Sequence, residues 1–131
     1  MIMIKALVFG ALISLVMQVK DCTAPRNKTA CFKGRLEIKG LCSNYTIKIL
    51  DGAMDTSGKM TNWIDENTGK TYTDVFALAN PCSFPPGIDE GDEFYFIVST
   101  AKDKGCNICM AYYPVPPKRV SISVLQKPCS Q

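Results

Sequence analysis

Between Cys82 and Cys129 the chain reads CSFPPGIDEGDEFYFIVSTAKDKGCNICMAYYPVPPKRVSISVLQKPC. Two runs in it, residues 94–98 and 119–125, combine apolar, β-branched and aromatic residues in the way that is typical of short strands. The first of them is apolar on both sides, so it is expected to be buried on both faces. Residues 108–113 have the same character and are also predicted to form a strand. Cysteines and proline-rich turns bracket these runs, which predicts β-structure held by disulfides.

Upstream of this half, hydrophobic periodicity predicts further strands. Residues 35–39 and 44–49 alternate between apolar and polar types, so each is expected to have one solvated face. The polar, glycine-containing stretch 51–70 is expected to be a long loop with a short strand at 60–64. Residues 72–79 are apolar enough to be buried on both faces.

These runs amount to five to seven short strands in one domain. An amphipathic helix is not evident after residue 18, apart from a single turn near residues 84–89. The pattern predicts a mainly all-β fold, either a small closed barrel or a sandwich. We assign residues 19–131 to this domain.

The first 18 residues have the pattern of a signal peptide. Lys5 precedes an apolar run over residues 6–17, which charged residues cut short before it reaches the length of a membrane-spanning helix. We expect residues 1–18 to be removed, with Ser14 and Lys20 as alternative cleavage points. The mature protein is thus expected to be secreted and extracellular, and free of the membrane after cleavage.

Charge and composition exclude several classes of function. Without residues 1–18 the chain keeps 14 basic and 12 acidic residues, a net charge of +2, which is too mild to predict nucleic-acid binding. The chain has no histidine, which removes serine–histidine and cysteine–histidine nucleophile pairs and histidine-ligated zinc. No glycine-rich phosphate loop is present either. We therefore expect neither a cofactor nor a bound metal.

Neighbouring acidic residues are the remaining candidates for catalysis. Asp89 and Glu90 are adjacent, as are Asp92 and Glu93. Adjacent side chains in strands and turns point apart, whereas paired catalytic carboxylates must face a common substrate. These acids are therefore interpreted as solvated loop residues, and the protein is not expected to be an enzyme.

Seven cysteines in a small exported chain predict a disulfide framework. Because seven is odd, one thiol is expected to stay free, to carry a small adduct, or to link two chains in a dimer. The pair Cys106 and Cys109 resembles a redox motif, but a strand-like segment follows it where a helix would be required. A zinc site would need a second such pair. Structural disulfides are therefore predicted for the cysteines, which are Cys22, Cys31, Cys42, Cys82, Cys106, Cys109 and Cys129.

Two sequons predict N-glycosylation. Asn27 and Asn44 each lie two residues before a threonine. Asn44 is the weaker candidate because it sits close to an expected disulfide and strand.

The spacing of several residues resembles a known family. Cys82 is followed eleven residues later by Glu93, the aromatic Phe94 and an apolar strand, and then by Cys109 and Cys129. This arrangement resembles the second half of netrin-like domains, especially the inhibitory domain of the tissue inhibitors of metalloproteinases. The similarity extends over residues 22–129, and its specific part is residues 82–98.

The resemblance implies a fold and a disulfide pattern. Netrin-like domains are five-stranded OB-type barrels, which agrees with the strand count. By analogy Cys31 would pair with Cys129, Cys22 with Cys82 or Cys109, and Cys42 with Cys106.

The resemblance also implies a function, although the sequence departs from the family pattern at one point. Family members that inhibit metalloproteinases begin with Cys-x-Cys and chelate the enzyme's zinc through the first cysteine, whereas here Cys22 is followed by Thr23 and Ala24. The resemblance thus implies a secreted binding module for an extracellular protein, with a protease as the narrower version. The expected partner-binding residues are Cys22, Thr23, Ala24 and Trp63. The side chain of Trp63 either packs within the domain or contacts the partner. The alternative is a structural component of the extracellular matrix.

Overall fold

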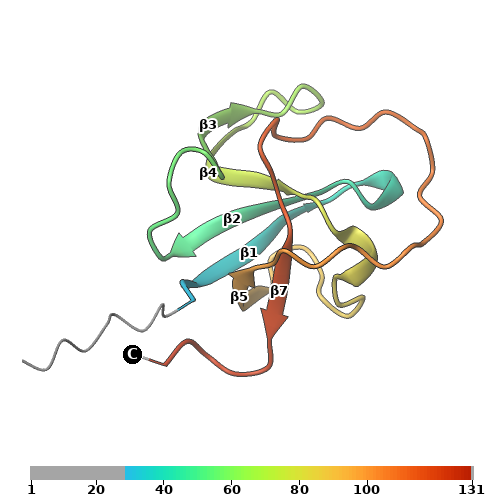
Figure 1. Ribbon diagram of the computed structural model, residues 1–131. Helices are drawn as coiled ribbons and strands as arrows, with labels where there is room; N and C mark the ends of the chain where they lie inside the picture. The colour runs from blue at the N-terminus through green and yellow to red at the C-terminus, as the bar shows by residue number, and fades with distance from the viewer. Residues whose placement is uncertain (1–28, 131) are drawn as a thin grey trace, which may run out of the picture.

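A computed structural model of the protein describes residues 29–130, and these residues form strands joined by loops and two single 3-10 turns (Figure 1). Within this range no helix is long and apolar enough to cross a membrane. The elements are β1 (Cys31–Lys39), η1 (Leu41–Ser43), β2 (Tyr45–Asp51), β3 (Met60–Ile64), β4 (Thr71–Leu78), η2 (Pro81–Ser83), β5 (Glu93–Val98), β6 (Arg119–Val120) and β7 (Ile122–Leu125).

All the strands belong to one sheet, so the all-β prediction is confirmed. The hydrogen-bonded order is β3-β4-β2-β1-β5-β7, and β6 pairs with β4. Every pair is antiparallel except β4 with β6. The sheet has seven strands and is not the closed barrel of five that the resemblance implied. It curls because β6 pairs with β4 and β7 pairs with β5, while only Ser121 separates β6 from β7.

Aromatic and aliphatic side chains from six strands, together with Phe84 after η2, fill the inside of the curl. Phe96 is fully buried, and its ring lies 5.3 Å from that of Phe32 and 5.8 Å from that of Phe76, measured between centroids. Burial of this apolar area is the main stabilising contribution to the sheet. The core cluster consists of Phe32, Leu36, Ile47, Ile49, Phe76, Leu78, Phe84, Phe94, Phe96, Val120 and Ile122.

Two strand predictions need correction. Residues 94–98 form β5, but burial alternates along it, since Phe94 and Phe96 are buried while Tyr95 and Ile97 are only partly covered. The run was expected to be buried on both faces, and the outer face is in fact partly solvated. Residues 108–113 form no strand and lie in the loop between β5 and β6. Two disulfides fix this segment in place of a hydrogen-bonded ladder.

Three disulfides join the six described cysteines, which confirms the disulfide framework. The bridge from Cys31 to Cys129 is the one that the netrin-like resemblance implied. The other implied pairs are wrong: Cys82 is joined to Cys106, and Cys42 to Cys109. The reason is the path of the β5–β6 loop, which passes η2 first and the β1–β2 turn second. Cys22 lies outside the described residues, and both partners expected for it are bonded elsewhere.

Candidate functional site

The loop of residues 99–118 is pinned to the sheet at two points three residues apart. Cys106 is joined to Cys82 in η2, with 5.6 Å between their Cα atoms, and Cys109 is joined to Cys42 in the β1–β2 turn, with 5.0 Å between theirs. Figure 1 shows the loop leaving β5, swinging past both elements and reaching the β3–β4 hairpin before β6. We call residues 99–118 the stapled loop. Its two central cysteines bond to different elements, so they do not form a redox pair with each other.

Hydrogen bonds order the first part of the stapled loop as well. The carboxylate of Asp103 accepts hydrogen bonds from the backbone N–H of Cys82 (3.2 Å) and from the hydroxyl of Ser83 (2.7 Å). The backbone N–H of Lys104 donates to the same hydroxyl oxygen at 3.1 Å. The loop therefore approaches its first disulfide in a fixed conformation.

The second anchor is a turn with strained backbone geometry. Cys42 and Ser43 both have left-handed φ angles, 58° and 59°, in a turn that normally favours Asn-Gly. Such a conformation costs roughly 1–2 kcal/mol for each non-glycine residue. A side chain at Gly40 would meet the ring of Tyr113 at 2.5 Å, so glycine is required there for the loop to close over the turn. The turn leaves Leu41 71% exposed.

The stapled loop exposes apolar side chains to solvent. Met110 is 98% exposed and Tyr112 is 79% exposed, although both are within three residues of a disulfide. Large apolar side chains held on the surface by covalent anchors are unfavourable for an isolated protein and are typical of interaction sites. Two covalent anchors reduce the conformational entropy that such a loop loses when it binds.

The β3–β4 hairpin lies beside the stapled loop. The hydroxyl of Tyr112 donates to Oε2 of Glu66 at 3.2 Å. In the same hairpin the rings of Trp63 and Tyr72 are 5.8 Å apart, and the amino group of Lys70 lies 4.7 Å from the centre of the Tyr72 ring. We use the name stapled face for the large side chains of the stapled loop, its second anchor and this hairpin, namely Leu41, Trp63, Tyr72, Met110, Tyr112 and Tyr113.

Negative charge gathers around this face. Burial raises the pKa of Tyr72, and the nearby carboxylates of Asp65, Glu37 and Glu90 raise it further. The negative charge of Glu66, together with its hydrogen bond, raises the pKa of Tyr112. For Tyr112 the Glu66 carboxylate is the main cause, so its raised pKa indicates a negative local potential, whereas for Tyr72 burial is the main cause.

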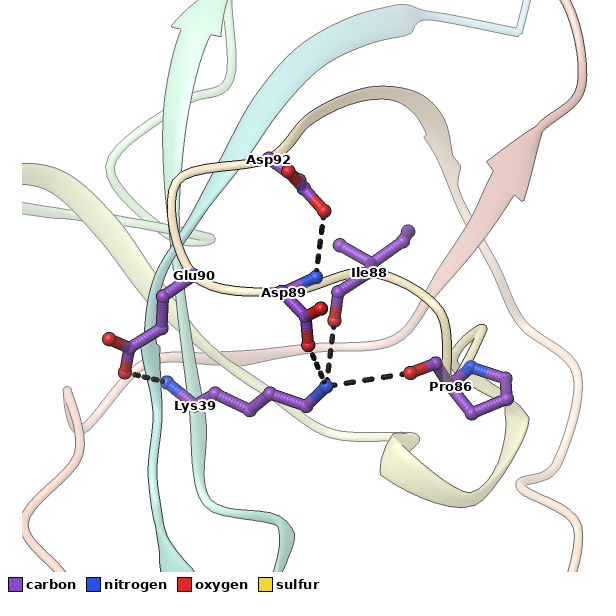
Figure 2. A network of polar contacts seen from close by, with 6 residues as sticks. All are labelled: Lys39, Pro86, Ile88, Asp89, Glu90 and Asp92. Carbon is purple, nitrogen blue, oxygen red and sulfur yellow. Dashed lines mark hydrogen bonds and ion pairs between the residues drawn. The ribbon is translucent and has the colours of Figure 1, made fainter.

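The acidic loop 85–92 is fastened to the end of β1 by Lys39. The amino group of Lys39 donates to Oδ1 of Asp89 (2.7 Å) and to the carbonyl of Ile88 (2.9 Å), as Figure 2 shows. The hydrogen bond that Lys39 donates to Asp89 raises the pKa of Lys39. Glu90 accepts from the backbone N–H of Lys39 (2.7 Å), and Asp92 accepts from that of Asp89 (2.9 Å).

These acids therefore hold the turn in place, and Glu93 has a similar role because it pairs with Lys33 at 2.8 Å. Within residues 29–130 no group of three or more histidine, cysteine or acidic side chains is arranged to hold a metal ion.

Of the predicted site residues, Trp63 belongs to the stapled face, half-buried against Tyr72. Asn44 lies at the second anchor, where its side-chain amide donates to the carbonyl of Leu41 at 2.9 Å. The other predicted residues, Cys22, Thr23, Ala24 and Asn27, lie outside the described range.

Sequence reasoning missed Met110 and Tyr112. The signal that could have identified them is their position directly after the pair Cys106 and Cys109. This position is informative only when the two cysteines are assigned to different partners.

A hollow in the surface lies elsewhere. It measures about 510 Å³ and lies next to the bridge between Cys31 and Cys129, at the opposite end of β1 from the stapled face. Ile97 and Leu125 line it, and Thr29 and Ser130 form part of its edge.

No protein-family model, curated protein or solved structure matches this chain. Function is therefore inferred from the chemistry of the surface alone.

Proposed function

We propose that the protein is a secreted binding module that docks an extracellular protein through the stapled face. The observation that carries this proposal is that two disulfides hold Met110 and Tyr112 exposed on a fixed loop. Three disulfides in about a hundred residues are typical of proteins from oxidising compartments, which supports export. A rigid support with an exposed apolar and aromatic centre is the composition expected of a binding hot spot.

Inhibition of a metalloproteinase is the narrower version that the netrin-like resemblance implies. It requires Cys22 to be the first mature residue. The two bridges that would hold an N-terminal arm are not available, since Cys82 and Cys109 are bonded to other cysteines. We therefore propose the stapled face, and not the segment at residues 22–24, as the docking surface.

Shortening two side chains of the stapled face is expected to weaken partner binding strongly without unfolding the protein. The mature chain is immobilised, and proteins retained from extracellular fluid of the source tissue are identified and their affinities measured. Leu41→Ala combined with Met110→Ala is expected to weaken binding of the identified partner at least tenfold, because both side chains are exposed and fixed.

Val98→Ala serves as the matched control, since Val98 is 46% exposed and lies in β5, outside the set of residues that makes up the stapled face. Far-ultraviolet circular dichroism should be the same for both variants. Equal binding by the wild type and the double variant would contradict the proposal.

A second function, that of a covalently dimeric matrix component, is favoured by the cysteine count. The chain has seven cysteines, and the six described ones are paired with each other. Cys22 thus has no cysteine of its own chain left as a partner. An extracellular thiol in that position either links two chains or reacts with a small thiol.

Electrophoresis of the secreted protein without reductant distinguishes these functions. If the protein is a covalent dimer, its band is expected at twice the monomer mass, and Cys22→Ser is expected to convert all of it to monomer. Cys42→Ser is the control, and it is expected to remain a dimer if Cys22 is the only cysteine that links the two chains. A wild-type protein that migrates as monomer in every preparation would rule out the dimer.

A further inference from the structure

Two carboxylates beside the stapled face have no cationic partner among residues 29–130. Glu66 accepts a hydrogen bond from Tyr112, and Glu90 accepts one from a backbone N–H. Both residues are exposed, and the four ion pairs of the described chain involve other acids. Asp65, which is only 3% exposed, adds a third negative charge under the same hairpin.

Aromatic rings next to these carboxylates are suited to a cation. Lys70 already lies over the ring of Tyr72, which shows that a cation is favourable at this hairpin. The ring of Tyr112 is 79% exposed and is held at its hydroxyl end by Glu66. An exposed ring with a carboxylate at its edge offers a cation both a π-face and an ion pair.

The face carries carboxylates that have no ion-pair partner among residues 29–130, on a chain whose formal net charge is +3. Around Tyr72 the charges of Asp65, Glu37 and Glu90 are close enough to influence its pKa; Glu37 is paired with Arg35, and Lys70 lies over the ring. A negative surface region on a positive protein orients a positively charged partner during its approach.

We propose that the partner docks through a segment in which an arginine lies next to apolar side chains. Its guanidinium group stacks on Tyr112 and pairs with Glu66, and its apolar neighbours contact Met110 and Leu41. Arginine fits better than lysine because its planar, weakly hydrated group stacks on an aromatic ring and donates to a carboxylate at the same time. This inference rests on the proposed docking function and specifies the chemistry of the partner.

Trp63 provides a direct test, since it is the single tryptophan of the chain and stacks beside Tyr72. The probes are three synthetic nine-residue peptides in which leucine alternates with arginine, with neutral citrulline, or with glutamate. Titration of the mature protein with the arginine peptide is expected to change Trp63 fluorescence in a saturable way. The citrulline peptide, which keeps the shape and loses the charge, is expected to bind at least fivefold more weakly, and the glutamate peptide not at all.

Two pairs of variants locate the interaction. Glu66→Gln is expected to weaken the arginine peptide about fivefold to tenfold, whereas Asp51→Asn removes the same charge at the far end of β2 and is expected to have no effect. Tyr112→Phe keeps the ring and is expected to retain most of the affinity, and Tyr112→Leu is expected to lose it. Raising the salt concentration should weaken binding of the wild type more than that of Glu66→Gln.

Either of two results would overturn the inference. One is that the citrulline peptide binds as tightly as the arginine peptide. The other is that Glu66→Gln and Asp51→Asn have equal effects. Failure of the docking function is recognised separately, because the Leu41→Ala/Met110→Ala variant would then bind the natural partner as tightly as the wild type does.

Discussion

Replacing both Cys31 and Cys129 by alanine is expected to lower the free energy of unfolding by about 4.7 kcal/mol, from the loop-closure entropy of a cross-link this long. The bridge spans 98 residues and joins the first residue of β1 to the segment after β7. Without it the unfolded chain gains the conformations that the bridge forbids. Small domains have only about 5–15 kcal/mol of stability, so the variant is expected to be partly unfolded at 37 °C.

Unfolding in urea, followed by circular dichroism without reductant, measures this loss. The matched variant lacks Cys82 and Cys106, whose bridge spans 24 residues. The same entropy estimate gives about 3.5 kcal/mol for that shorter loop, so it should be less destabilising. A loss below about 1 kcal/mol for the longer bridge would show that the two chain ends are held together by packing and not by the disulfide.

The sequence was sufficient for most strands because their signal is local. Alternation at residues 35–39 and 44–49 matches β1 and β2, and the short strand expected at residues 60–64 is β3. In β1 buried and partly exposed residues alternate along the whole strand, so period-two alternation is a direct consequence of its surroundings. β2 also buries residues in the core, whereas β3 has no buried residue.

The stapled loop could not be predicted because its order comes from distant residues. Residues 108–113 have the composition of a strand, but their place is set by Cys42, which is 67 residues from Cys109. Six cysteines can be paired in fifteen ways, and sequence spacing does not select among them. The sequence therefore predicts a strand that includes Met110 and Tyr112, whereas both residues lie in a loop with their side chains exposed.

The strand wrongly predicted at residues 108–113 has a physical reason that the burial error in β5 does not share. Local patterns predict elements whose hydrogen bonds are made to neighbouring strands of the sheet, and they fail where covalent bridges replace the ladder. The candidate site lies in the second kind of segment, so the sequence indicated a binding module without indicating its surface.

Phe96→Ala is expected to cost about 4 kcal/mol, which is typical of removing a fully buried phenylalanine from a core. The ring contacts those of Phe32, Phe76 and Phe94, and a Cβ at Gly34 would come within 2.9 Å of it. The absence of a side chain at Gly34 thus leaves room for the ring, and alanine at position 96 would leave a cavity between β1, β4 and β5. Urea unfolding of the variant gives the free energy directly.

Val98→Ala in the same strand is the control, and its expected effect is about 0.5 kcal/mol because the side chain is partly exposed. The comparison also tests the strand register, in which Phe96 lies opposite Phe32. A slip of one residue would turn Tyr95 and Ile97 inward and Phe96 outward. In that register Tyr95→Ala would be the costly substitution and Phe96→Ala a mild one, so the order of these two losses decides which face of β5 packs against the core.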